Sequence, residues 1–212
     1  MRVVLTGFMG TGKSAVGRRV AERLGRRLVD TDVEIERIEG MPVREIFARS
    51  GEARFRELER RVVVESCSAG DVVIATGGGT ILDAGNRSSL ADGALMVCLG
   101  ASPETIARRV RAYAADRPLL AGAKSLTARI RELLDERQPI YAAVPLQVDT
   151  SKRTIEQVAD TIVAALSAAE QGVLHPRREA DAGESVAAKP GSAGGGRLPL
   201  RRPTERRGIV AP

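Results

Sequence analysis

The residues best suited to chemistry form one uninterrupted segment near the N-terminus, Gly7-Phe8-Met9-Gly10-Thr11-Gly12-Lys13-Ser14, directly after an apolar run at residues 3–5. This is the G-x-x-x-x-G-K-S pattern of a phosphate-binding loop between a strand and a helix. Glycines allow successive backbone N–H groups to surround a phosphate at the positive end of that helix. The segment therefore predicts a nucleoside triphosphate site.

Four polar side chains have separate expected tasks around such a phosphate. Lys13 is expected to reach the β and γ phosphates, and Ser14 to bind the Mg²⁺ that bridges them. Asp30 follows the apolar pair Leu28-Val29 and is expected to be a second acid on the metal side. In extended backbone Asp32 would point the same way as Asp30, towards a hydroxyl group to be phosphorylated. The alternative is that Asp32 only caps a helix over residues 33–39.

A rival interpretation of the same glycines is a dinucleotide site. Gly10-Thr11-Gly12-Lys13-Ser14-Ala15 fits the looser G-x-G-x-x-A pattern, and Asp30 follows at the spacing of a ribose-binding acid. Gly7 and the Lys-Ser pair have no task in a nicotinamide site, whereas each has one in a triphosphate site. The triphosphate interpretation is therefore favoured.

Composition limits the class of protein. The chain has 212 residues, 43% hydrophobic and 28% charged, which is typical of one globular domain with additional segments. No apolar run reaches the ~18 residues of a membrane span, and the N-terminus does not have the pattern of a signal peptide. We therefore expect a cytoplasmic protein without membrane association.

Cysteine and histidine usage narrows the chemistry. Cys67 and Cys98 lack metal-ligand spacing and are expected to be reduced thiols that pack in the interior. The only histidine, His175, lies beyond the last periodic segment, which excludes a histidine triad or a histidine-ligated zinc within the core. Carboxylates, arginine, lysine and Mg²⁺ must carry the reaction.

The net charge of +6 is concentrated near the C-terminus, because residues 171–212 hold 8 Arg and Lys against 4 Asp and Glu. This segment is rich in Gly, Pro, Ala and Arg without apolar periodicity, so we interpret it as a disordered tail after a domain at residues 1–170. The five aromatic residues of the chain are too scattered to stack on bases. Nucleic acid is therefore not expected as a ligand.

Short apolar runs at residues 3–5, 28–29, 72–75, 95–99 and 146–148 alternate with longer helical patterns. This alternation is typical of an α/β protein with a parallel sheet and helices on both faces. Ser102-Pro103-Glu104 predicts one helix start, and Thr154-x-x-Gln157 predicts a capping box for the last helix. The apolar stripe of that helix is expected to contain Ile155, Val158, Ala159, Ile162, Val163 and Leu166.

Further motifs resemble those of the shikimate kinase family in order and spacing. They are Gly7 to Ser14, Asp30-Thr31-Asp32, Phe55-Arg56-x-x-Glu59, Gly77-Gly78-Gly79, Arg117-Pro118-Leu119-Leu120 and Glu136-Arg137-x-Pro139-x-Tyr141. The resemblance covers residues 1–170. It implies a P-loop kinase fold with a five-stranded parallel sheet, a mobile lid at residues 113–124, and transfer of the γ-phosphoryl group of ATP to the 3-hydroxyl of shikimate, on the route to chorismate.

The resemblance also implies roles for individual residues. Those implied for the nucleotide are Gly10, Thr11, Gly12, Lys13, Ser14, Ala15, Arg109, Arg117 and Arg153, and those implied for shikimate are Asp32, Arg56, Gly77, Gly78, Gly79 and Arg137. Ser14 and Asp30 are implied as Mg²⁺ ligands, and Lys13, Asp32 and Arg117 as catalytic residues. Glu59, three residues after Arg56 on one helix face, is expected to hold that guanidinium. The expected assembly state is a monomer.

Other function classes remain as alternatives. A kinase for another small hydroxy acid, such as gluconate, shares the phosphate loop and lid but not the pair Arg56 and Arg137. A nucleoside monophosphate kinase would need cues for base recognition that are not evident in the sequence. A GTP switch would need an N-K-x-D motif, yet the only asparagine, Asn86, is followed by Arg87. A non-catalytic ATP-binding regulator is disfavoured by Asp32 and the two arginines.

Overall fold

The computed structural model describes residues 1–117 and 119–173. They fall within a compact unit, Met1–Arg177. The predicted tail at residues 171–212 lies outside the described residues except for residues 171–173, and His175 lies outside them as well. The extent of the domain, residues 1–170, stays a prediction.

Five parallel strands form one sheet in the order β2-β3-β1-β4-β5. The strands are β1 (Arg2–Thr6), β2 (Leu28–Asp30), β3 (Val73–Ala75), β4 (Ala94–Gly100) and β5 (Leu146–Asp149). Four of them contain a whole predicted apolar run, β3 contains the run at residues 72–75 except for Val72, and the five-stranded parallel sheet is confirmed. The central strand β1 pairs with both β3 and β4, so that Val4 lies opposite Ile74 on one side and Met96 on the other. The carboxyl ends of the strands therefore meet at one edge, where parallel sheets bind ligands.

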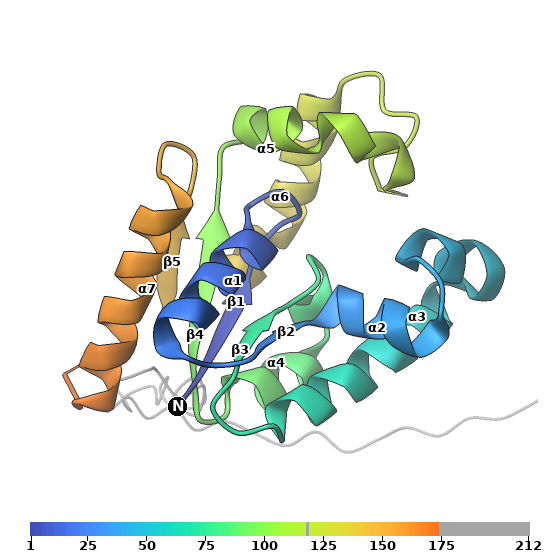
Figure 1. Ribbon diagram of the computed structural model, residues 1–212. Coiled ribbons are helices and arrows are strands. Elements are labelled where there is room, and N and C mark those ends of the chain that lie inside the picture. The colour runs from blue at the N-terminus through green and yellow to red at the C-terminus, as the bar shows by residue number, and fades with distance from the viewer. Residues whose placement is uncertain (118, 174–212) are drawn as a thin grey trace, which may run out of the picture. The chain divides into compact units, whose positions relative to one another are not determined.

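The helices are α1 (Lys13–Leu24), α2 (Thr31–Glu39), α3 (Val43–Cys67), α4 (Ala84–Ala91), α5 (Pro103–Val110), α6 (Leu126–Ala142) and α7 (Ile155–Glu170), with short 3-10 turns at η1 (Thr80–Leu82) and η2 (Arg111–Asp116). Alternate strand residues face opposite layers. Val3 and Leu5 pack in the layer of α1 and α7, whereas Val4 packs in the layer of α3 to α6. Figure 1 shows α7 beside α1 on one side of the sheet. Helices on both faces are thus confirmed.

The predicted helix starts are present. Ser102 caps α5, with Pro103 in its first turn, and Thr154 forms a capping box with Gln157 at the start of α7. Most of the predicted stripe of α7 is buried, but Ile155 is 46% exposed and that part of the prediction is wrong. A helical side chain leans towards the N-terminus, so a residue in the first turn projects past the helix rather than onto the core.

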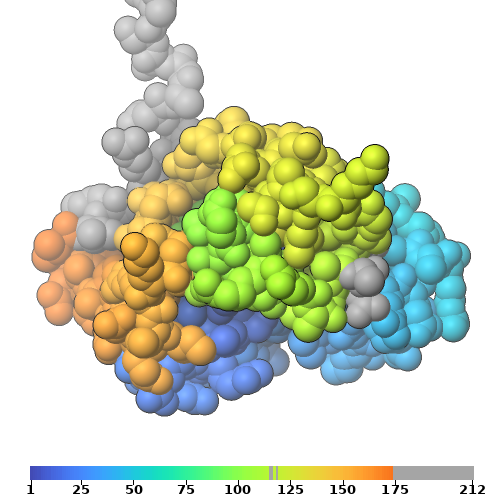
Figure 2. Space-filling model, turned by 90° about the horizontal axis from the view of Figure 1, so that it is seen from above, coloured from blue at the N-terminus to red at the C-terminus, as the bar shows by residue number. Residues whose placement is uncertain are grey.

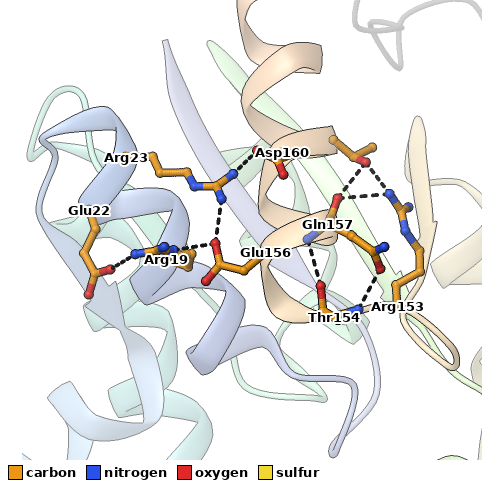
Figure 3. A network of polar contacts seen from close by, with 9 residues as sticks. Arg19, Glu22, Arg23, Arg153, Thr154, Glu156, Gln157 and Asp160 are labelled. Carbon is orange, nitrogen blue, oxygen red and sulfur yellow. Dashed lines mark hydrogen bonds and ion pairs between the residues drawn. The ribbon is translucent and has the colours of Figure 1, made fainter.

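The exposed rim between α1 and α7 carries charged pairs (Figure 3). Arg19 Nε lies 2.7 Å from the Glu156 carboxylate, and Arg23 pairs with both Glu156 and Asp160. Because these groups are largely exposed to water, their mutual attraction is screened. Burial of the apolar stripes of the two helices therefore contributes more to their packing than these pairs do.

The start of α2 corrects one sequence expectation. Asp30, not Asp32, is the capping residue, because its side chain accepts from the backbone N–H groups of Asp32 and Val33. Asp32 lies within the first helical turn rather than in extended backbone. The helix starts at Thr31 because the carboxylate of Asp30, at the end of β2, satisfies N–H groups that would otherwise lack partners.

Helices α2 and α3 pack together beyond the β2 edge. Their cluster contains Ile35, Ile46, Phe55, Leu58 and Val62. Residues 111–125 connect α5 to α6 and begin with the 3-10 turn η2. We call them the lid segment, and the mobile lid at residues 113–124 stays a prediction. In Figure 2 this yellow-green segment lies next to the cyan part of α3. The lid segment and the α2–α3 pair therefore face one another at the carboxyl edge of the sheet.

Both cysteines are free thiols, as expected, with Cys98 buried and Cys67 partly buried. Among residues 1–117 and 119–173, none of the helices combines the length and apolar content needed to cross a bilayer.

Candidate active site

The phosphate-binding loop connects the end of β1 to α1. Gly7 has a φ of 125°, and a Cβ there would lie 2.2 Å from the carbonyl oxygen of Leu99, so no other residue fits. Gly12 precedes α1 in a left-handed conformation, and no side chain caps the helix. The first-turn N–H groups of α1 thus remain without a side-chain acceptor, as an anion site at a helix N-terminus requires.

The side chain of Lys13 lies against the backbone of this loop. Its Nζ donates to the carbonyl oxygens of Gly7 and Phe8, each at 2.9 Å. Burial lowers the pKa of Lys13 to about 8, although the carboxylates of Asp32 and Asp30 oppose the shift. The ammonium therefore lies beside the loop and is poorly solvated. A phosphate bound there would stabilise its positive charge.

Ser14 and Asp30 form a pair of hard oxygen donors. Ser14 Oγ donates to Asp30 Oδ2 at 2.5 Å, while Asp30 Oδ1 accepts from the N–H of Asp32 at 3.2 Å. Mg²⁺ typically binds through one or two protein oxygens, with water and phosphate completing its octahedron. The chemistry of this pair fits Mg²⁺.

Asp32 lies beside the pair and has a perturbed acidity. Burial, and then the charge of Asp30, raise the pKa of Asp32 to about 6, while Lys13 acts in the opposite direction. Gly77 is its closest glycine neighbour, since a Cβ there would lie 2.6 Å from Asp32 Oδ1. The glycine lets the backbone after β3 approach this carboxylate.

Arg56, on α3, is held by two glutamates. Its Nη1 donates to Glu59 at 2.7 Å, and its Nε and Nη2 reach Glu52 at 3.2 and 3.1 Å. Glu59 is 1% exposed and also accepts from Thr80 Oγ1 at 2.7 Å. The expected contact between Glu59 and Arg56 is thus present, and it is buttressed by a threonine that sequence reasoning missed although it directly follows the glycine triplet.

The glycine triplet, residues 77–79, follows β3 and approaches Arg56. A Cβ on Gly79 would lie 3.2 Å from Arg56 Nη2, and the carbonyl of Gly78 accepts from the hydroxyl of Tyr141 at 2.6 Å. Tyr141 is the last residue of the Glu136 to Tyr141 motif, but its spacing alone gave no hint of this contact. The hydroxyl fixes the direction of one peptide of the triplet.

Arg137, on α6, has a different environment from Arg56. Its guanidinium carbon lies 5.4 Å from the centre of the Phe8 ring. Within the part of the chain that the structure describes, no carboxylate forms an ion pair with it. A guanidinium without a carboxylate partner is suited to bind one from a ligand.

The carboxylates, the two arginines and the glycine triplet described above line a single cavity of about 630 Å³ at the carboxyl edge of the sheet. It gathers nine of the predicted site residues, namely Ser14, Asp30, Asp32, Arg56, Gly77, Gly78, Gly79, Arg117 and Arg137. Arg117 enters from the lid side, where its guanidinium carbon lies 5.5 Å from the Tyr113 ring centre. Its neighbour Pro118 lies outside the described residues.

The other predicted site residues do not line this cavity: they are Gly10, Thr11, Gly12, Lys13, Ala15, Arg109 and Arg153. Five of them belong to the loop or the first turn of α1. Arg109 donates from Nη1 to the Gly10 carbonyl at 3.2 Å and so contacts the backbone of the loop. Arg153 instead donates to Gln157 and Thr161 of α7, as Figure 3 shows. The arginines predicted for the nucleotide thus lie in different surroundings.

Comparison with known proteins places this arrangement in a family. Residues 9–167 match the family model described as shikimate kinase. A shikimate kinase of Caldanaerobacter subterraneus subsp. tengcongensis is 44% identical over 77% of this chain and 94% of its own. One from Desulforudis audaxviator is 43% identical over 85% and 93%. The structure of shikimate kinase from Acinetobacter baumannii in complex with shikimate is 35% identical, covers 80% of this chain and 94% of its own, and has a TM-score of 0.74. The chain therefore belongs to the shikimate kinase family.

Proposed function

We propose that this protein transfers the γ-phosphoryl group of ATP to the 3-hydroxyl of shikimate. The observation that carries the proposal is the set of side chains that line the 630 Å³ cavity together. Ser14, Asp30 and Asp32 line it with oxygen atoms, and Arg56 and Arg137 line the same cavity with guanidinium groups. A ligand that carries a carboxylate for the arginines and a reactive hydroxyl for Asp32 matches this set of groups.

On the nucleotide side, the loop supplies backbone N–H groups and Lys13 for the β and γ phosphates. Ser14 and Asp30 would hold Mg²⁺, which neutralises charge on the phosphates when bound. Lys13 is expected to carry its full charge once phosphates surround it, because an anion opposes the effect of burial on its pKa. Arg153 and Arg109 are proposed to contact the adenine.

On the acceptor side, Arg137 and Arg56 are proposed to bind the carboxylate of shikimate. Arg56 brings a guanidinium already oriented by Glu59 and Glu52, whereas Arg137 brings one without a carboxylate partner among the described residues. The glycine triplet permits the backbone to approach the ring hydroxyls. Such fixed contacts hold the reactive hydroxyl near the transferred phosphoryl group, and this positioning lowers the entropic part of the barrier.

Asp32 is proposed to accept the proton of the attacking hydroxyl. With a pKa of about 6 it is largely ionised at neutral pH, yet it is more basic than an ordinary aspartate. Phosphoryl transfer has a loose transition state, so orientation of the hydroxyl by this carboxylate contributes more than its basicity. Arg117 is proposed to stabilise the charge that develops on the transferred group as the lid closes.

We propose that the chain acts as a cytoplasmic monomer. The requirement for ATP supports the cytoplasmic location.

The experiment is a coupled assay of ADP release from Mg·ATP with shikimate, gluconate or water as acceptor, on the full chain and on residues 1–170. Shikimate-dependent release by both, with identification of the 3-phosphate, is the expected result. Release stimulated only by gluconate would show that the acceptor is wrong. Binding of Mg·ATP without release in any arm would favour the non-catalytic regulator.

A further inference from the structure

A buried threonine after the last strand touches the phosphate loop. Thr150 is 2% exposed and lies directly after β5. Its hydroxyl oxygen lies 3.1 Å from the carbonyl oxygen of Thr11 and 3.0 Å from that of Gly100. The Gly100 carbonyl already accepts from the backbone N–H of Thr150 at 2.8 Å, which leaves the single hydroxyl proton for Thr11. It also accepts from Arg109 Nη1 at 3.0 Å. One small side chain thus meets the loop, the end of β4 and α5.

Arg109 completes this contact from the α5 side. Besides the Thr150 hydroxyl, Nη1 reaches the carbonyl oxygen of Gly10 at 3.2 Å, and Nη2 donates to the carbonyl oxygen of Thr150 at 2.7 Å. Arg109 therefore donates to the carbonyl of Gly10, and Thr150 to the carbonyl of the next loop residue, Thr11. We refer to Arg109 and Thr150 as the clamp.

The direction of a carbonyl determines the direction of the next N–H group. In a trans peptide the C=O of one residue and the N–H of the next point in opposite directions. A hydrogen bond on the Thr11 carbonyl therefore directs the Gly12 N–H away from Thr150. Thr11 is 1% exposed, so its carbonyl would have little access to water if the clamp were lost. The clamp thus both satisfies a buried acceptor and orients a donor of the loop.

We propose that Thr150, acting on the loop directly and through Arg109, is a positioning residue for nucleotide binding. This inference rests on the proposed function, because it concerns the same triphosphate site. It does not depend on contact between Thr150 and the nucleotide. The clamp lies away from Arg56, Arg137 and the glycine triplet, none of which it contacts among the described residues. Its effect is therefore expected on ATP and not on shikimate.

The test is calorimetric titration of Mg·ATP into the full chain and into three variants. Thr150→Val keeps the shape and removes the hydroxyl, and it is expected to weaken Mg·ATP binding by about tenfold. Thr150→Ser keeps the hydroxyl and is expected to bind within about twofold of the unsubstituted chain. Thr105→Val is the matched control, since Thr105 is also buried and its hydroxyl accepts from Ser102 but has no contact with the loop in the described structure.

The KM for shikimate at saturating ATP is expected to stay unchanged in all three variants. Equal Mg·ATP affinity of Thr150→Val and the unsubstituted chain would overturn the positioning role. So would a lower melting temperature with no change in affinity, which would make Thr150 purely structural. If the unsubstituted chain itself fails to bind Mg·ATP, the proposed function is overturned together with this role.

A second variant tests the clamp without changing the buried threonine. Arg109→Lys keeps the charge but cannot reach three acceptors with a planar fork, and it is expected to lower Mg·ATP affinity several-fold. Because Arg109 is also proposed to contact the adenine, the clamp is tested by the coupling of this variant with Thr150→Val and not by the single loss. If the two residues act as one unit, the double variant with Thr150→Val loses no more Mg·ATP affinity than the single variant with the larger loss. Fully additive losses would show that Arg109 acts independently and would overturn the clamp.

Discussion

The phosphate loop and the acceptor wall are built in different ways. The loop is one continuous segment, and the groups proposed to bind the nucleotide there are backbone N–H groups, Lys13 and Ser14. The acceptor wall takes Arg56 from α3, the glycine triplet from the turn after β3, and Arg137 from α6. A change in the loop should therefore damage the reaction itself, whereas a change in the wall should damage selection of the acceptor.

The largest effect is expected from Lys13→Met, which removes the loop's ammonium. Turnover is expected to fall by about a thousandfold or more, because charge on the phosphates loses its nearest protein cation. The fold should survive, since burial already lowers the pKa of Lys13 to about 8 and the charge is not stabilised there. Steady-state rates with a thermal melt as the control test this, and near-normal kcat would remove Lys13 from the catalytic residues.

The next largest effect is expected from Arg117→Ala, at the lid. kcat is expected to fall by about a hundredfold or more, while the KM for shikimate changes little, because the interaction forms mainly in the transition state. Arg111→Ala, also an exposed arginine in the segment between α5 and α6, is the matched control. Equal loss in both variants would mean that the lid segment, rather than Arg117, had been disturbed.

A substitution in the acceptor wall should affect shikimate without affecting the nucleotide. Arg56→Ala is expected to raise the KM for shikimate by about thirtyfold, the cost of one charge-assisted contact, with Mg·ATP affinity near normal. Arg54→Ala on the same helix is the control, because Arg54 pairs with Glu39 and Glu57 and does not line the cavity. Comparable loss of Mg·ATP binding in Arg56→Ala would show that the two regions are not independent.

The smallest effect is expected in the pH dependence of kcat/KM for shikimate, on its acid side. Because the pKa of Asp32 is raised to about 6 and its ionised form is the one proposed to accept the proton, kcat/KM for shikimate is expected to fall about tenfold per pH unit below 6. A profile flat to pH 5 would contradict this.

The same shift affects stability with the opposite sign. Since folding raises the pKa of Asp32 above its ordinary 3.8, this carboxyl opposes folding at neutral pH, and its cost is relieved as pH falls through 6 towards 4. Asp32→Asn is therefore expected to raise the melting temperature of the ligand-free protein at pH 7 while it removes most of the activity. A lower melting temperature would show that the charge of Asp32 is favourable in the folded state.

Local signals accounted for much of what was predicted correctly. The five apolar runs, the cap at Ser102 and the capping box at Thr154 each lie within a few residues, so nothing distant is needed to recognise them. The incorrect expectations concern ends of elements: Ile155 in the stripe, Asp32 in extended backbone, and the alternative of Asp32 as a helix cap. There a neighbouring residue or the edge of the core decides the outcome.

By itself, the sequence determined the phosphate loop, the parallel α/β sheet and the set of charged residues available for the acceptor. Only the tertiary structure decided that Thr80 supports Glu59, that Tyr141 fixes the Gly78 carbonyl, and that Thr150 holds the loop from behind. The physical reason is range. A loop or a cap is fixed by hydrogen bonds between near neighbours in the chain, whereas these contacts join residues that only the packing of the sheet and helices brings together.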